Sequence, residues 1–145
     1  MSTHELVVRF ALLRARAIDR VRAENGAPVN KILTVYKISD AAAWREAERL
    51  GRFTGAPIDL QDGFIHFSSA AQVRETAARH FAGKSDLVLA AVDAPALGDA
   101  LKWEPSRGGD LFPHLYASLD LTAVRWVKPL RLDAQGRHQF PELEP

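Results

Sequence analysis

DGFIHFSSAAQVRETAARHFAG, residues 62–83, contains in order the signals for a turn, a strand, a capped helix and a helix end. The initial Asp-Gly pair favours a turn, because glycine adopts positive φ at little cost and aspartate hydrogen-bonds to its own backbone. Successive side chains of a strand point to opposite faces, so Phe64, His66 and Ser68 should share one face. We therefore expect a histidine and a serine side by side at the end of a strand that leads into a helix.

The helix that follows is predicted to begin with a capping box formed by Ser69 and Gln72. In such a box the serine hydroxyl accepts a bond from a free backbone N–H, and the glutamine side chain reaches back to the serine backbone. Apolar residues then recur at helical spacing, and Gly83 suits the position after the last turn. Because a helix N-terminus attracts anions, His66 and Ser68 would lie beside a favourable place for an anionic ligand. The alternative is a hydrogen-bonded core histidine beside a capping serine.

Size and composition are those of one globular domain. The chain has 145 residues, a formal net charge of +1 and no cysteine. The near-neutral charge gives no argument for nucleic acid or an anionic membrane as partner, and no apolar run approaches the roughly 20 residues of a membrane-spanning helix. Without cysteine there is no disulfide, thiolate nucleophile or zinc–thiolate site. We expect a cytoplasmic protein with a small-molecule ligand, and the sequence leaves its oligomeric state open.

Residues 1–30 are predicted to form an amphipathic helix and a linker, and residues 31–145 a single α+β domain. In the first segment apolar residues recur at helical spacing, with arginines on the opposite side. A signal peptide is not expected, because Arg9 interrupts the apolar run and no small-residue cleavage site follows. A helix on a membrane surface is one alternative, but we favour an extension that docks on the domain or on a partner.

The remaining elements follow from apolar patterning and turn residues. Strands are predicted at 32–38, 87–92, 101–104 and 124–132, and a helix is predicted from a cap at Ser39 or Asp40 to Gly51. The segment 52–61 is predicted to be irregular, and Pro113 restricts a strand at 111–116 to an edge or a bulge. This order predicts an α+β fold with split, mostly antiparallel sheets and packed helices. No glycine-rich phosphate loop is present.

Seven polar side chains are candidates for a functional site: His66, Ser68, Gln72, Glu104, Arg107, His114 and Tyr116. On a strand His114 and Tyr116 share a face, so two strands that each carry a histidine and a hydroxyl would line a polar cleft. If burial shifts its pKa, Glu104 suits a general base or an electrostatic stabiliser; the alternative is a solvated strand end.

Two other chemistries fit the sequence less well. His66, His114 and Glu104 have the composition of a two-histidine, one-carboxylate metal site, but no close ligand spacing such as H-x-x-x-H occurs, so we predict no metal. A serine-hydrolase triad is not predicted either, because Ser68 lacks the G-x-S-x-G motif around a nucleophile.

The motifs GFIHFS, LKWE and FPHLY together resemble a family of small bacterial proteins, the domain-of-unknown-function family 952. The resemblance covers about residues 32–141 and leaves the first thirty outside it. The family has no established activity, so the resemblance implies a fold without naming a reaction.

The same motifs are distantly similar to the ADP-ribosyltransferase-like fold, which includes RNA 2′-phosphotransferases. In that fold an H-x-S motif binds NAD, so the resemblance implies that His66 holds the adenosine ribose, Ser68 touches the nicotinamide amide and Tyr116 stacks on nicotinamide. Here Phe67 replaces the usual glycine, and Glu104 precedes the tyrosine instead of following it.

The expected function is therefore that of a nucleotide- or NAD-binding protein of the ADP-ribosyltransferase or phosphotransferase type. The expected ligand-binding residues are His66, Ser68, Gln72, Arg107 and Tyr116, and the expected catalytic residues are Glu104 and His114. NAD is the candidate substrate, and no resident cofactor is expected. A non-catalytic binding or interaction module on the same fold is the alternative, and the sequence leaves enzyme status open.

Overall fold

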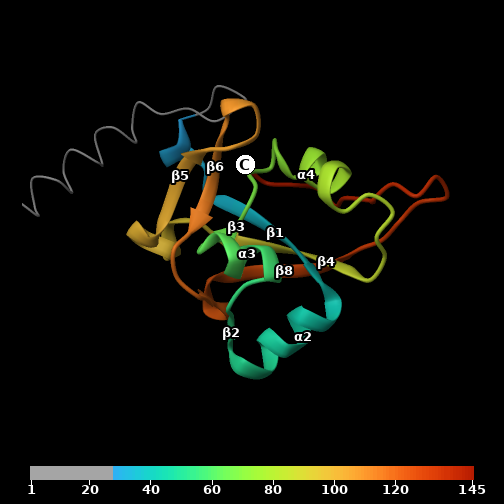
Figure 1. The fold of residues 1–145 in the computed structure, drawn as a ribbon, viewed down its shortest axis with the longest axis horizontal. Coiled ribbons are helices and arrows are strands. Elements are labelled where there is room, and N and C mark those ends of the chain that lie inside the picture. The colour runs from blue at the N-terminus through green and yellow to red at the C-terminus, as the bar shows by residue number, and fades with distance from the viewer. Residues whose placement is uncertain (1–27) are drawn as a thin grey trace, which may run out of the picture.

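The computed structural model describes residues 28–145 and has an α+β fold (Figure 1). The strands are β1 Thr34–Asp40, β2 Arg52–Phe53, β3 Ile65–His66, β4 Leu87–Asp93, β5 Leu101–Pro105, β6 Leu111–Leu115, β7 Leu119–Asp120 and β8 Val124–Leu130. The helices are α2 Ala41–Leu50, α3 Pro57–Asp62 and α4 Val73–His80, with 3-10 turns at Val29–Lys31, Pro95–Ala100, Arg107–Gly109 and Leu121–Ala123. Every strand pair within residues 28–145 is antiparallel, which confirms the predicted α+β class.

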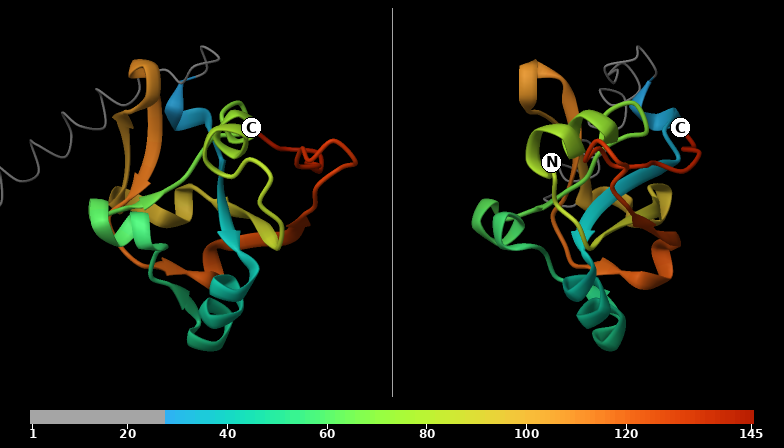
Figure 2. Two further views of the ribbon diagram at one scale, coloured as in Figure 1. Left: turned by 45° about the vertical axis from the view of Figure 1, so that its right-hand side comes forward. Right: turned by 90° about the vertical axis from the view of Figure 1, so that its right-hand side faces the viewer.

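The first sheet has the order β1-β4-β8, and its central strand β4 is buried on both faces. Ala90 and Val92 pack into a core with Trp44 of α2, whereas Leu89 and Ala91 pack into a second core beneath α4. This explains the continuous apolar sequence of β4, because a strand covered on both sides needs apolar residues at every position. Two further views show α4 and α2 at different ends of the molecule (Figure 2).

The segment that contains β3 connects this sheet to another one. Ile65 and His66 pair with β6 in a sheet of order β3-β6-β5. Two residues later, Ser68 exchanges both backbone hydrogen bonds with Tyr36 of β1, at 2.7 and 2.9 Å. The chain therefore crosses from one sheet to the other between His66 and Ser68.

The prediction of an irregular segment at 52–61 was wrong, because it contains β2 and the first five residues of α3. Pro57 occupies the first turn of α3, where the missing N–H costs nothing, and Gly63 ends it with a φ of 85°. Gly55 has a φ of 124°, and a Cβ there would lie 3.0 Å from Cβ of Asp59. The glycine and proline are thus the boundary signals of a short helix.

The expectation that Pro113 places its strand at an edge or bulge was also wrong, because β6 is the middle strand of its sheet. The carbonyl of Pro113 accepts a bond of 3.0 Å from the backbone N–H of Phe67, just beyond the end of β3. In an antiparallel strand the N–H and C=O of one residue point to the same neighbour. The backbone N–H that Pro113 lacks would therefore point to the place just beyond β3, where the pairing of β3 with β6 stops.

The start of the central helix differs from the expected capping box. The side chain of Gln72 accepts a bond from the backbone N–H of Ser69 at 3.0 Å, as predicted, and donates to the carbonyl of Leu111 at 2.6 Å. The Ser69 hydroxyl is buried and has no hydrogen-bond partner within the described region. Three turn residues, 70–72, precede Val73, so the helix begins later than expected.

The core begins before the expected domain start at residue 31. Val29 is only 2% exposed and packs with Ile32 and Ala94. The predicted N-terminal helix lies in residues 1–27, outside the described part, so the division at residues 30 and 31 stays a prediction. Within residues 28–145, no helix is long and apolar enough to cross a membrane.

Replacing Gln72 with leucine should destabilise the fold, because it leaves the N–H of Ser69 and the carbonyl of Leu111 without their buried partner. Each buried group left unpaired costs about 1–3 kcal/mol. Ser69→Ala is the matched control and should leave stability unchanged, because it removes a hydroxyl that has no partner. Urea denaturation of both variants measures the difference. A larger loss in Ser69→Ala than in Gln72→Leu would contradict the observed start of α4.

Candidate functional site

Five side chains from β3, β5, β6 and the residues that directly flank β3 and β6 meet two carboxylates from α3 at one end of the second sheet. We name this group the histidine cluster: Asp59, Asp62, Phe64, His66, Glu104, His114 and Tyr116. The strand register brings the two histidines together, because His66 lies opposite His114 and His114 lies opposite Lys102. Strands β3, β6 and β5 lie beside α3 in the ribbon view (Figure 1).

The ring of Phe64 is the centre of the histidine cluster. Its centroid lies 4.1 Å from that of His114, with 21° between the planes, and 4.6 Å from that of His66. The ring centroid of Tyr116 lies 5.3 Å from that of Phe64, on the exposed side of the cluster. The Lys102 ammonium lies over the Tyr116 ring, 4.9 Å from its centroid. Such ring contacts stabilise beyond the area that they bury, so Phe64 holds the two imidazoles in a defined orientation.

Both ring nitrogens of His66 face carboxylates. Nδ1 lies 2.6 Å from Oδ1 of Asp59, and Nε2 lies 2.9 Å from Oδ2 of Asp62. A carboxylate only accepts hydrogen bonds, so both contacts are satisfied when both nitrogens carry a proton. His66 is therefore fixed in place by α3, while a third of its side chain stays exposed.

Asp59 organises this part of the site and was not found from the sequence. Its carboxylate accepts two bonds from the Lys37 ammonium, at 3.1 and 2.9 Å, in addition to bonds from the backbone of Ala56 and from the backbone and ring of His66. Both charged side chains are buried. The available signal was its position, three residues after Ala56 in a helix that starts with Pro57, where a carboxylate can bond back to the helix start.

The charge of Asp59 is set by competing effects. Burial raises its pKa, but the hydrogen bond from His66, the Lys37 charge and the Ala56 N–H outweigh it and lower the pKa to about 2. Burial lowers the pKa of Lys37, and the attraction of Asp59 opposes this shift. The pair is thus a buried ion pair whose remaining bonds come from the backbone and from the His66 ring, including the carbonyl of His66 at 2.9 Å from the ammonium.

The second half of the cluster is built on Glu104. Its Oε1 accepts from Nδ1 of His114 at 2.9 Å and from the Tyr116 hydroxyl at 2.7 Å, whereas Oε2 has no recorded partner in the described region. Burial raises the pKa of Glu104, but the bonds from Tyr116 and His114 outweigh it and the net shift is downward. Burial lowers the pKa of His114, and Glu104 opposes the shift. At neutral pH the group is a carboxylate that holds a neutral imidazole through its Nδ1–H.

The structure brings four of the seven candidate residues together and separates the other three. His66, His114, Glu104 and Tyr116 all belong to the histidine cluster. Ser68 is buried and bonded to the Thr76 hydroxyl at 2.9 Å, Gln72 is fully buried at the start of α4, and Arg107 lies 4.8 Å above the ring of Phe112.

The expected pairing of His66 with Ser68 on one strand face is not realised, because the chain changes sheets between them. Ser68 pairs with β1 and faces α4, whereas His66 pairs with β6 and faces α3. Arg107 also lies apart from the cluster, with its Nη2 3.8 Å from Oε2 of Glu75 in α4.

Among residues 28–145, no three histidine, aspartate or glutamate side chains are grouped in a way that would hold a metal ion.

Comparison with known proteins places the chain in a family. Residues 38–127 match the family model described as "Protein of unknown function (DUF952)", and the chain belongs to this family. Protein CC0527 from Caulobacter crescentus, seen in an X-ray structure, is 51% identical in sequence to this chain. The match covers 73% of this chain and 93% of CC0527, and the two have the same fold at a TM-score of 0.71. The solution NMR structure of CC0527 is also 51% identical, covers 73% and 91% of the two chains, and gives a TM-score of 0.67. No curated protein matches the chain.

The stability conferred by Asp59 should depend on pH in the acid range. Its pKa is about 2 in the folded state against 3.8 for the free group. A lowered pKa adds stability that is complete above the unfolded value and is lost as pH falls through the folded value, here about 2–3 kcal/mol in total. Denaturation at several pH values from about 5 down to 2 measures this loss. In the double variant Lys37→Met/Asp59→Leu, which removes both charges, the decline should be shallower; an equally steep decline would contradict the assignment.

The pKa of His114 should respond to Glu104. An NMR titration of the wild type should give a value below 6.5, since burial disfavours the charged ring. Glu104→Gln should lower it further, because the variant loses the charge that favours the imidazolium. Glu48→Gln, the same change at an exposed position of α2, is the control and should leave the value unchanged. A higher value in Glu104→Gln would show that the two groups do not interact as described.

Proposed function

We propose that the protein binds a nucleotide-type ligand at the histidine cluster, with NAD and ADP-ribose as first candidates. The observation that supports this most is the state of Glu104: its Oε1 is held by His114 and Tyr116, and its Oε2 is left to accept a hydrogen bond from a ligand. More than a third of the Glu104 side chain is exposed, so a ribose hydroxyl can reach it.

Neighbouring groups suit the other parts of a nucleotide. Tyr116 as a residue is 43% exposed, and stacking on an aromatic side chain is a common way to bind a base. The ammonium of Lys102, which lies over the same ring, adds positive charge for a phosphate. The proposal gives no ligand contact to Ser68, Gln72 or Arg107, since all three are engaged elsewhere.

If the ligand reacts, the roles of the residues follow from their charges. The Glu104 carboxylate would stabilise positive charge that develops on a ribose as its bond to nicotinamide breaks. His114, neutral and donating through Nδ1, would have Nε2 free to accept a proton from the attacking group. His66, held by Asp59 and Asp62, would position the substrate. This is the ADP-ribosyl-transfer form of the proposal.

A non-catalytic binding module is the second candidate. The observation that favours it is that the serine of the His-x-Ser motif is buried against Thr76, and the histidine already has two carboxylate partners. On this alternative the histidine cluster would bind the ligand without breaking a bond.

Calorimetric titration with NAD and ADP-ribose, followed by an assay of nicotinamide release, tests the proposal. Tyr116→Ala should weaken binding by about tenfold or more, because stacking is worth about 1–3 kcal/mol per base. Glu104→Gln should leave binding within a few-fold, since the amide NH₂ that replaces Oε2 can donate to a ribose hydroxyl, which also accepts hydrogen bonds. The same variant loses the negative charge and should lower any release by about 10²–10³.

Glu48→Gln is the control for charge and should change neither quantity. Binding without nicotinamide release would favour the binding module over the transferase. If neither ligand binds the wild type at millimolar concentration, the nucleotide proposal is wrong.

A further inference from the structure

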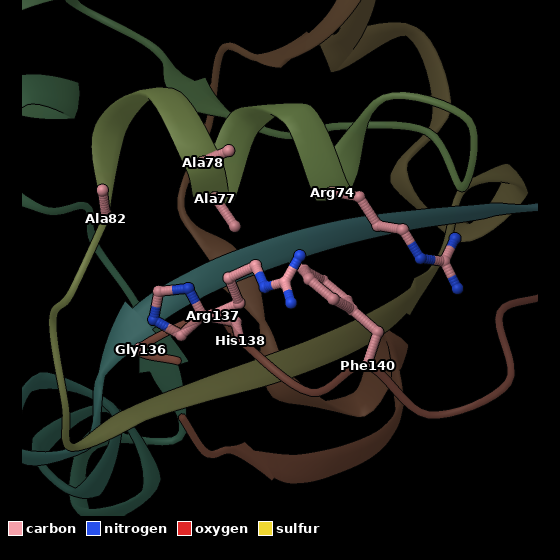
Figure 3. A pocket seen from close by; sticks show the side chains of 8 residues that line it. All are labelled: Arg74, Ala77, Ala78, Ala82, Gly136, Arg137, His138 and Phe140. Carbon is pink, nitrogen blue, oxygen red and sulfur yellow. The ribbon is translucent and has the colours of Figure 1, made fainter. Parts of the chain in front are cut away.

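A concave surface lies between α4 and the C-terminal turn, and none of its lining residues belongs to the histidine cluster. It is a cavity of about 360 Å³, within the roughly 300–1,000 Å³ of small-molecule sites. Its lining residues are Arg74, Ala77, Ala78, Ala82, Gly136, Arg137, His138 and Phe140. Figure 3 shows Ala77 pointing from α4 toward the turn and Ala82 on the chain just beyond the helix, with the side chains of the turn below.

The charged groups of this cavity are all basic, since no aspartate or glutamate is among its lining residues. The guanidinium of Arg74 packs over the ring of Phe140 at 5.4 Å and has no ion pair recorded in the described region. Arg137 reaches only one carboxylate, that of Asp133, at the long distance of 3.8 Å. Oδ1 of Asp133 accepts from the backbone N–H groups of Gln135 and Arg137 at 2.9 Å each, and the Arg137 side chain approaches the other oxygen. Two guanidinium groups therefore keep free donors around one hollow.

The wall opposite α4 is held in place by hydrogen bonds. The turn is closed by a hydrogen bond of 2.7 Å from the N–H of Asp133 to the carbonyl of Arg137. Leu132 and His138 form an isolated antiparallel β-bridge beside it. His138 donates from Nε2 to the carbonyl of Lys84 at 2.8 Å, which ties the turn to the loop after α4. A cavity whose walls are fixed before binding loses little conformational entropy when a ligand enters.

We propose that this cavity binds a small organic anion, with a phosphate or carboxylate at Arg137 and Arg74 and an apolar or aromatic part under α4. Guanidinium groups offer paired donors that match the oxygens of either anion. The short alanine side chains leave room for a flat ring of the ligand, and Phe140 forms one edge of the cavity (Figure 3). The site shares no residue with the histidine cluster, so the two proposals can fail separately.

Phenyl phosphate and benzoate are suitable probes, with phenol and inorganic phosphate as fragments. The full-length chain labelled with ¹⁵N is titrated while the amide signals of Ala77, Ala78, Ala82 and Gly136 are followed. Either aromatic anion should shift these signals saturably and bind more tightly than phenol or inorganic phosphate. The tighter of the two identifies the anionic group, and added salt should weaken binding.

Arg137→Gln should weaken binding of the better probe by about tenfold, the effect expected for losing a charge-assisted hydrogen bond. The side chain is 78% exposed, so the fold should be unaffected. Arg45→Gln makes the same change of net charge on α2, outside the cavity, and should have no effect. The proposal is overturned if no saturable shift occurs in the millimolar range, if phenol binds as tightly as the anions, or if Arg45→Gln weakens binding as much as Arg137→Gln.

Discussion

The buried ion pair between Lys37 and Asp59 is the interaction on which the position of the histidine cluster depends. It joins β1, α3 and β3, because Asp59 also bonds the backbone and ring of His66, and Lys37 bonds the carbonyl of His66. Burying two charges is costly unless their hydrogen bonds are nearly all made. Here each oxygen of the carboxylate has more than one donor, so the pair fixes a geometry and does not merely add attraction.

The crossing of the chain between sheets gives this region its second property. Because β3 lasts only two residues before the chain turns to β1, His66 pairs with β6 of one sheet and Ser68 pairs with β1 of the other. The short strand also leaves room for Pro113 in the centre of the second sheet. One segment thus delivers a histidine to a polar cluster and, two residues later, anchors α4 through the contact between Ser68 and Thr76.

The net charge is near zero, but two surfaces of the protein differ in the sign of the charges that they carry. The histidine cluster contains three carboxylates, and Glu104 keeps one oxygen available, so it suits ligands that donate hydrogen bonds. The cavity beneath α4 has arginines without close carboxylate partners and suits ligands that accept them. Total charge carries no information on such separation, because it depends on which residues the fold places together.

The sequence by itself determined the elements whose signals are local. Apolar runs and alternation located β1, β4, β5 and β8, glycine marked the end of α2, and three short motifs indicated the family. Strand alternation also placed His114 and Tyr116 on one face, where both reach Glu104. Only the tertiary structure decided that Asp59 and Lys37 form the support of His66, and that Ser68 belongs to the core. Those facts rest on contacts between residues 22 positions apart and on a change of sheet within three residues, and neither leaves a periodic trace in the sequence.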